Sequence, residues 1–226
     1  MKHNRPKIKI CCIKSREELA TVVKYGVDCV GFVSKMPSGP GIISDREIRD
    51  IAKYAPEHVD TFLLTSHLDP KKIIEQQQFC KTKTVQLCNP LKINDLKKLK
   101  EALVGVKIVG VTHVLNEESI QKAVELQDFV DAILLDTGNP CGASPELGGT
   151  GRTHNWDVSK KICQHVTSPV YLAGGLNHKN VIAAIEHVDP YGIDLCCGVR
   201  TNDKLDEKKL QLLLGAIEDY FHKNTE

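Results

Sequence analysis

The stretch Val170-Tyr171-Leu172-Ala173-Gly174-Gly175-Leu176-Asn177 carries the clearest structural signal in the sequence. It is a short apolar run that ends in two glycines, and residues with helical spacing follow from Asn180. Such a run is typical of a β-strand that enters a helix through a tight turn. Glycines at that turn allow backbone N–H groups to approach a phosphate without obstruction by a side chain. The stretch therefore predicts both a strand–helix unit and a phosphate site.

The same alternation recurs along the whole chain and predicts the fold. The apolar runs are 7–12, 28–33, 59–65, 84–88, 106–111, 132–136, 170–173 and 193–197. The helical segments are 17–25, 45–54, 70–79, 93–101, 119–126, 158–165, 180–187 and 205–221. Strands that alternate with helices of this length form parallel sheets. Eight such units predict a closed (β/α)8 barrel, the TIM barrel of the α/β class, because a doubly wound sheet of five or six strands leaves two runs unplaced.

Composition narrows the class of protein and of partner. The chain has 226 residues, 41% of them hydrophobic and 26% charged, and no linker divides it, which predicts one domain over 1–226. The 30 basic and 29 acidic residues leave a formal charge of +1, so we expect neither nucleic acid nor a membrane as a partner. No apolar run nears the roughly 20 residues that span a bilayer, and the first residues do not resemble a secretory signal. We therefore expect a cytoplasmic protein whose nine cysteines are reduced thiols.

The candidate site residues follow the predicted strands, because active sites of (β/α)8 barrels lie at the carboxyl ends of the strands. Asp136 ends the sixth run, where a carboxyl group can exchange a proton with a ligand. Cys11, near the end of the first run, can act as a base or a nucleophile when it is a thiolate. This fold commonly binds phosphate in the loops after strands seven and eight, which here contain Gly174, Gly175, Gly198 and Val199.

Each of these signals also has a purely structural interpretation. Asp136 can cap a helix or brace a loop, Cys11 can be a buried cysteine, and the glycines can form ordinary turns. The glycine-rich segment 148–156 after the sixth run is either a loop that moves over a ligand or a solvent loop anchored by Trp156. Phosphate binding is favoured because glycine turns follow two neighbouring strands.

Together these residues resemble the phosphoribosylanthranilate isomerase family nearly from end to end. The segments that carry the resemblance, in the right order and spacing, are Lys9-Ile10-Cys11, Gly31-Phe32-Val33, Val85-Gln86-Leu87, Leu134-Leu135-Asp136, Gly148-Gly149-Thr150-Gly151 with Trp156, Leu172-Ala173-Gly174-Gly175-Leu176-Asn177, and Asp194-Leu195-Cys196-Cys197-Gly198-Val199.

The resemblance implies an isomerase of tryptophan biosynthesis. It implies an Amadori rearrangement of N-(5-phosphoribosyl)anthranilate to 1-(2-carboxyphenylamino)-1-deoxyribulose 5-phosphate, without a cofactor or metal. Asp136 is then the general acid that protonates the ribose ring oxygen, and Cys11 the general base that removes the C2 proton of the Schiff base. These roles require a neutral carboxyl group and a thiolate. The expected partner is a phosphorylated small-molecule substrate. The oligomeric state is either a monomer or a homodimer, and the sequence does not decide between them. Further expected substrate contacts are Lys9, Gln86, Gly149, Arg152, Asp194 and Arg200.

The chain departs from the family pattern at two informative places. The glycine that follows the catalytic cysteine in the family is Cys12 here. In the family the loop after the second strand contains an arginine that holds the anthranilate carboxylate, whereas residues 38–44 here contain none. An arginine is the natural partner of a planar carboxylate. Lys35, Arg152 and Arg200 are the candidates to replace it.

Two other functions stay open from the sequence. One is a divergent barrel isomerase that acts on another aminosugar phosphate. The other is a non-catalytic barrel that binds a phosphorylated ligand or acts as an assembly factor, against which the pair Cys11 and Asp136 argues. A metal site of Cys11, Cys12, Cys196 and Cys197 is disfavoured, because adjacent residues of a strand point to opposite faces.

Lys9 and Asp194 carry an expectation about the barrel interior. Lys9 shares a face of the first strand with Cys11, which must point inward to act as a base. A buried ammonium requires a partner, and Asp194 on the adjoining last strand is the expected one. The ammonium then either helps to keep Cys11 a thiolate or only props the barrel interior.

Overall fold

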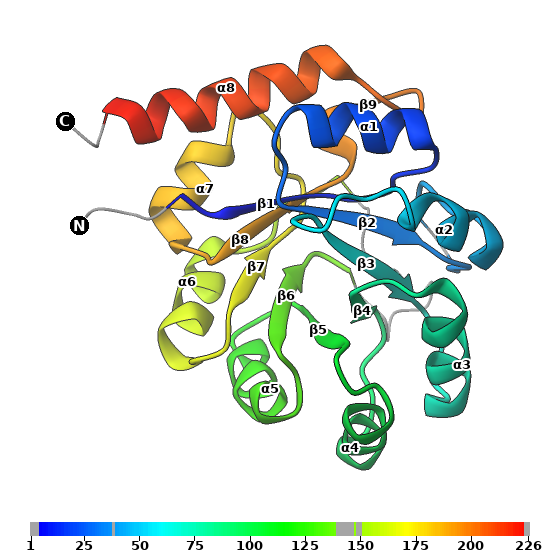
Figure 1. The fold of residues 1–226 in the computed structure, drawn as a ribbon. Helices are drawn as coiled ribbons and strands as arrows, with labels where there is room; N and C mark the ends of the chain where they lie inside the picture. Colours follow the sequence, from blue (N-terminus) through cyan, green and yellow to red (C-terminus); the bar gives the residue numbers. More distant parts are fainter. Residues whose placement is uncertain (1–4, 38, 139–146, 148–150, 224–226) are drawn as a thin grey trace.

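The computed structural model describes residues 5–37, 39–138, 147 and 151–223. Within them, eight parallel strands pair in sequence order and close into a barrel where β8 pairs with β1 (Figure 1). The strands are β1 (Lys7–Ile10), β2 (Cys29–Val33), β3 (Asp60–Thr65), β4 (Thr84–Leu87), β5 (Lys107–His113), β6 (Ala132–Asp136), β7 (Val170–Leu172) and β8 (Gly192–Leu195). The predicted (β/α)8 barrel is confirmed.

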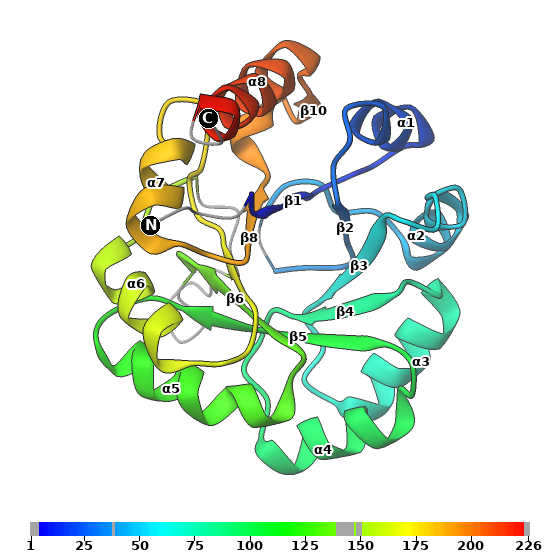
Figure 2. The same cartoon turned by 60° about the vertical axis from the view of Figure 1, so that its left-hand side comes forward.

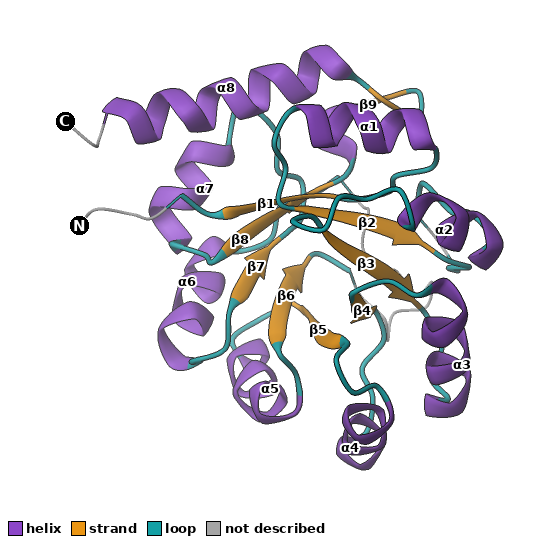
Figure 3. Cartoon of the chain, viewed as in Figure 1, coloured by secondary structure: helices purple, strands orange, loops and turns teal. Residues whose placement is uncertain are grey.

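The helices form a ring outside the strands, as Figures 2 and 3 show. They are α1 (Arg16–Lys24), α2 (Asp45–Ala52), α3 (Pro70–Cys80), α4 (Ile93–Ala102), α5 (Glu118–Leu126), α6 (Trp156–His165), α7 (Val181–Val188) and α8 (Glu207–Lys223), with short 3₁₀ turns at η1 (Gln127–Phe129) and η2 (Cys197–Val199). The last helix, α8, contacts α1, where the Tyr25 hydroxyl lies 2.7 Å from a Glu207 carboxylate oxygen. No helix in the described part of the chain is both long and apolar enough to span a bilayer.

Local sequence signals set where the helices begin. At α2 the Ser44 hydroxyl accepts the Glu47 amide at 3.2 Å, and the Glu47 carboxylate accepts the Ser44 amide at 2.8 Å. This reciprocal capping satisfies two amide groups that have no partner inside the helix. At α3, Asp69 caps the helix and Pro70 takes the first helical position, where a missing N–H group costs nothing. Capping side chains of this kind stabilise a helix by about 1 kcal/mol each.

Alternation along the strands separates two layers of side chains. On β1, Ile8 and Ile10 belong to the core between the strands and the helices, whereas Lys9 and Cys11 face the barrel interior with Phe62 of β3. The interior is therefore a packed layer of small, aromatic and polar side chains that lies beneath the carboxyl ends of the strands.

The expected element boundaries hold within about two residues, and three of the differences of this size lie at the barrel mouth. The strands β1 and β8 end at Ile10 and Leu195, two residues before the predicted ends, and β5 continues to His113. Cys12 has φ +65°, a left-handed conformation that stops an extended strand. A short antiparallel pair after β8, β9 (Arg200–Thr201) with β10 (Lys204–Leu205), has no signal in the sequence.

Candidate active site

A pocket opens at the carboxyl ends of the strands and collects the main candidate residues. Its lining includes Cys11 beyond β1, Gln86 on β4, Asp136 at the end of β6 and Asp194 on β8. The barrel closure brings these residues together, because they lie on strands that are separated by up to 183 residues of sequence yet reach the same end of the barrel. Glycines 174, 175 and 198 line the same pocket.

Asp136 is held at the pocket by the backbone of the following residue. Its Oδ1 accepts the Thr137 amide at 2.7 Å. Burial raises the pKa of Asp136 to about 6, the nearby Asp194 carboxylate adds to this rise, and the hydrogen bond from Thr137 opposes it. A carboxyl group with a pKa near 6 is partly protonated near neutral pH, so it can donate a proton to a ligand.

Cys11 lies beside Gly31 of β2, and its side chain is 5% exposed. A Cβ atom at Gly31 would come within 2.8 Å of the Cys11 sulfur, so glycine is required there to make room for the thiol. The Cys11 amide donates to the Leu195 carbonyl at 2.8 Å and anchors this end of β1 to β8. The thiol therefore has a fixed position at the floor of the pocket.

Lys9 and Asp194 form a buried ion pair below Cys11, as the alternation predicts. Lys9 has no exposed surface, and its Nζ lies 2.7 Å from Asp194 Oδ2. Burial disfavours the ammonium, but the charges of Asp194 and Cys11 outweigh it and raise the pKa of Lys9 above its ordinary value. The second oxygen, Asp194 Oδ1, is buried without a hydrogen-bond partner, and Asp194 lines the pocket. Buried oxygen atoms need partners, so this atom is suited to accept a ligand hydroxyl.

The loops after β7 and β8 touch each other closely. Gly174 and Gly175 have φ +84° and +61°, and the side-chain Nδ2 groups of Asn177 and Asn180 donate to the Gly175 carbonyl at 3.2 and 3.1 Å. A Cβ atom at Gly198 would lie 1.9 Å from the Leu176 carbonyl oxygen, so no side chain fits there. These glycines place backbone at the pocket wall, the arrangement that suits an anion.

One of the expected binding residues, Val199, is engaged away from the pocket, and a second lies outside the described residues. The Val199 amide donates to the Cys196 carbonyl at 3.2 Å inside η2, and its side chain belongs to the outer core, so Gly174, Gly175 and Gly198 are the remaining candidates for phosphate. Gly149 lies outside the described residues.

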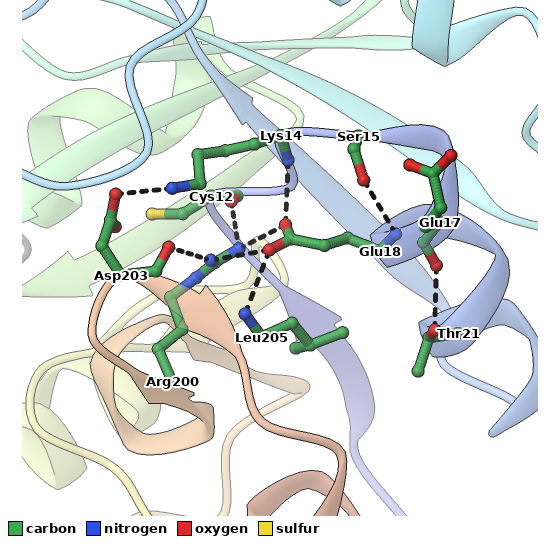
Figure 4. A network of polar contacts seen from close by, with 9 residues as sticks. All are labelled: Cys12, Lys14, Ser15, Glu17, Glu18, Thr21, Arg200, Asp203 and Leu205. Atoms are coloured by element: carbon green, nitrogen blue, oxygen red, sulfur yellow. Dashed lines mark hydrogen bonds and ion pairs between the residues drawn. The ribbon is translucent and has the colours of Figure 1, made fainter.

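Arg200 is a bracing residue in this structure and does not line the pocket. Its guanidinium contacts both carboxylate oxygens of Glu18 at 3.1 and 2.8 Å, and it also donates to the carbonyls of Asp203 and Cys12. Figure 4 shows Arg200 between Glu18 and the backbone of Cys12. The bidentate pair is nearly buried, with the two side chains 4% and 14% exposed. Arg200 therefore stabilises the left-handed turn at Cys12 and does not contact the pocket where a ligand would bind.

The remaining cations lie at the rim or away from the lining. Arg152 is exposed, and its backbone packs against Gly175, where an added Cβ would lie 2.7 Å from the Arg152 carbonyl carbon. Lys35 is exposed as well. No lysine or arginine occurs among the described residues that line the pocket.

Cys12 corrects the expectation that adjacent cysteines point to opposite sides of the strand. Both Cys11 and Cys12 line the pocket, as do Cys196 and Cys197. Successive side chains point to opposite faces only where the backbone is extended. The backbone at Cys12 is left-handed, so the alternation does not extend to this residue. No arrangement of three or more His, Cys, Asp or Glu side chains suited to a metal ion is found in the described part of the chain. The family has a glycine at the position of Cys12. Because glycine is the usual residue at a left-handed φ, that glycine is the sequence signal that could have predicted the turn.

Comparison with known proteins agrees with the fold and shows the family. The family model described as N-(5'-phosphoribosyl)anthranilate (PRA) isomerase matches residues 8–216. The enzyme of that name from Methanocella arvoryzae is 33% identical over 212 residues, which cover 94% of this chain and 96% of the relative. The phosphoribosyl anthranilate isomerase structure from Thermotoga maritima superposes with a TM-score of 0.81 and 28% identity, over 95% of this chain and 99% of that one. A structure of this isomerase with reduced 1-(o-carboxyphenylamino)-1-deoxyribulose 5-phosphate has a TM-score of 0.79 and 26% identity, with 95% and 99% coverage. The chain belongs to the N-(5'-phosphoribosyl)anthranilate isomerase family.

Proposed function

We infer that this chain isomerises N-(5-phosphoribosyl)anthranilate to 1-(2-carboxyphenylamino)-1-deoxyribulose 5-phosphate in tryptophan biosynthesis, and we propose that Asp136 and Cys11 are its acid and base. The family supports the reaction. The observation that supports the two roles is one pocket that contains a carboxyl group with a raised pKa, a fixed thiol and a glycine wall.

The proposed reaction begins with the neutral carboxyl group of Asp136. It donates its proton to the furanose ring oxygen, the bond from C1 to that oxygen breaks, and the nitrogen lone pair forms the protonated Schiff base. The Cys11 thiolate then removes the C2 proton, and the electrons of that C–H bond neutralise the iminium to an enolamine. Tautomerisation of the enolamine gives the aminoketose. Each step needs a group at the matching protonation state, which is why the raised pKa of Asp136 matters.

The other pocket residues have supporting roles in this proposal. Glycines 174, 175 and 198 hold the phosphate through backbone amide groups. The free oxygen of Asp194 and the buried, unpartnered Oε1 of Gln86 accept sugar hydroxyls. The Lys9 ammonium, paired with Asp194, places positive charge in the barrel interior below the Cys11 thiol.

We also propose one domain over 1–226, a cytoplasmic location, and a monomer or homodimer. A structure of monomers generated from the dimeric Thermotoga maritima isomerase is among the similar proteins, so both states occur with this architecture. A single unfolding transition supports one domain, and sedimentation of the purified protein reports the oligomeric state.

A growth assay tests the reaction directly. The gene is introduced into a bacterium that lacks phosphoribosylanthranilate isomerase, and growth without tryptophan is expected. Cys11→Ser and Asp136→Asn are expected to abolish growth and to lower turnover by about 100-fold or more, while both proteins stay folded. Failure of the wild-type chain to support growth, together with no turnover of the purified substrate, contradicts the proposal.

One observation favours a second substrate class. The pocket lining in the described residues offers no arginine or lysine to an aglycone carboxylate, so another aminoaldose phosphate fits the same chemistry. Measuring kcat/KM for N-(5-phosphoribosyl)anthranilate and for an analogue that lacks the carboxylate distinguishes the two substrate classes. A higher kcat/KM for the carboxylate-free substrate supports the second class, and loss of activity on it supports the first.

A further inference from the structure

Four thiols gather at the mouth of the barrel beside the proposed catalytic base. This thiol cluster consists of Cys11, Cys12, Cys196 and Cys197, all of which line the pocket. The proposed reaction uses only Cys11. The ends of β1 and β8 bring the four together, because Ile10 and Leu195 are partners in the parallel register and each precedes a pair of cysteines.

Cys12 occupies a position that its backbone makes unfavourable. Its φ is +65°, and a residue with a Cβ atom in the left-handed region costs roughly 1–2 kcal/mol. The turn is enforced from two sides, since Arg200 donates to its carbonyl and Gly41 packs on its side chain, where an added Cβ would be 2.5 Å from Cys12 Cβ. Glycine would remove the backbone cost. A thiol retained at a strained position points to a use for its side chain.

Cys196, just beyond the end of β8, packs against the interior cluster that contains Cys11 and Cys12. Hydrogen bonding with Cys11 and Cys196, together with burial, raises the pKa of the Cys12 thiol. Hydrogen bonds from Cys12 and Cys197, together with the positive charges of Arg200 and Lys9, lower the pKa of Cys196 below its ordinary value. Cys196 is partly exposed, and Cys197 beside it is exposed, so a reagent that enters the pocket mouth can reach this sulfur.

We propose that Cys12 and Cys196 form a reversible disulfide that inactivates the enzyme. Both thiols line the pocket just beyond the paired ends of β1 and β8, and the bond would cross the pocket mouth next to Cys11. Pairs of adjacent cysteines are poorer candidates, because their Cα atoms are about 3.8 Å apart, below the roughly 4.4–6.8 Å of usual disulfides. Cys12 and Cys196 belong to two different segments of the chain, so the short separation of adjacent Cα atoms does not apply to them.

The oxidant is a low-molecular-weight disulfide, and the exchange balances. The Cys196 thiolate attacks one sulfur of the small disulfide, whose S–S bond breaks and releases one small thiolate. Cys12 then attacks the Cys196 sulfur of the mixed disulfide, and the second small thiol leaves with the Cys12 proton. The protein loses two electrons, which the small disulfide gains. A dithiol reductant reverses both steps.

The test treats the reduced full-length protein with oxidised glutathione and follows turnover and free thiols. We expect loss of two thiols per chain, a fall in turnover of about 100-fold, the scale for a displaced catalytic site, and recovery with dithiothreitol. Mass spectrometry is expected to find the peptide of residues 10–14 cross-linked to the peptide that ends at Arg200. Thiol counting and the cross-link do not depend on which aminosugar is the substrate, so they stand apart from the proposed function.

Variants assign the bond to its two sulfurs. Cys12→Gly suits the left-handed φ, and Cys196→Ala removes the other partner; each is expected to keep its own reduced-state turnover after oxidation and to show no cross-link. Cys163→Ala, which removes a half-buried thiol of α6 outside the pocket, is expected to respond like the wild type. The proposal is overturned if oxidation leaves turnover and thiols unchanged, if both variants are inactivated like the wild type, or if the cross-link persists in Cys12→Gly and so belongs to Cys11.

Discussion

Replacing Asp136 by Asn should stabilise the protein near neutral pH while it removes the proposed general acid. The ordinary pKa of 3.8 rises to about 6 in the folded chain, so the folded state holds the Asp136 proton more tightly than the unfolded state. Stability that depends on this proton is present below pH 4 and is lost as the pH rises to 6. With about 1.36 kcal/mol for each pKa unit, the ionised carboxylate destabilises the fold by up to about 3 kcal/mol at pH 7. Asparagine carries no charge at any pH and can still accept the Thr137 amide.

Urea unfolding of the two proteins at pH 4 and pH 7 measures this difference. We expect the free energy of unfolding of Asp136→Asn to exceed that of the wild type by about 2 kcal/mol more at pH 7 than at pH 4, with turnover lower by about 100-fold. Asp219→Asn, on the exposed face of α8, is the matched control and should show no such change with pH. A stability difference that is the same at both pH values refutes the reasoning, since the Asp136 carboxyl would then not be destabilised by burial.

Three further substitutions test the packing around the site. Lys9→Met leaves the Asp194 carboxylate buried without its counter-ion and should lower the free energy of unfolding by about 3–5 kcal/mol; if the variant folds, alkylation of the catalytic thiol should need a higher pH, and an unchanged profile means that Lys9 is only structural. Gly198→Ala should raise KM and weaken protection by inorganic phosphate, because the new Cβ forces the two phosphate loops apart, whereas Gly215→Ala in α8, with open space around it, should leave KM unchanged. Cys12→Gly should raise the free energy of unfolding in urea by up to about 1 kcal/mol, because it removes left-handed strain; a clear loss of stability would show that the side chain contributes more than the turn costs.

Much of the site could be predicted from the sequence pattern, because strands and glycine turns depend on residues that are close together in the chain. Alternation on β1 places Lys9 and Cys11 on one face, and the closure of the barrel follows from the number of strands. These two facts predict the Lys9–Asp194 pair, which the 2.7 Å contact confirms. The prediction from strand alternation that the Cys12 side chain points away from the barrel interior was wrong. The left-handed backbone at Cys12 places its thiol in the pocket instead.

The sequence by itself determined the eight strand–helix units, the family, and the strand ends that carry Asp136, Cys11 and the glycines, because each of these depends on residues that are close in the chain. Only the tertiary structure decided that Arg200 pairs with Glu18, 182 residues away, and braces Cys12 instead of facing a ligand. It also decided that four cysteines share one pocket and that burial raises the pKa of Asp136. Charge partners and burial are set by the elements that pack around a residue, and no local pattern records which elements those are.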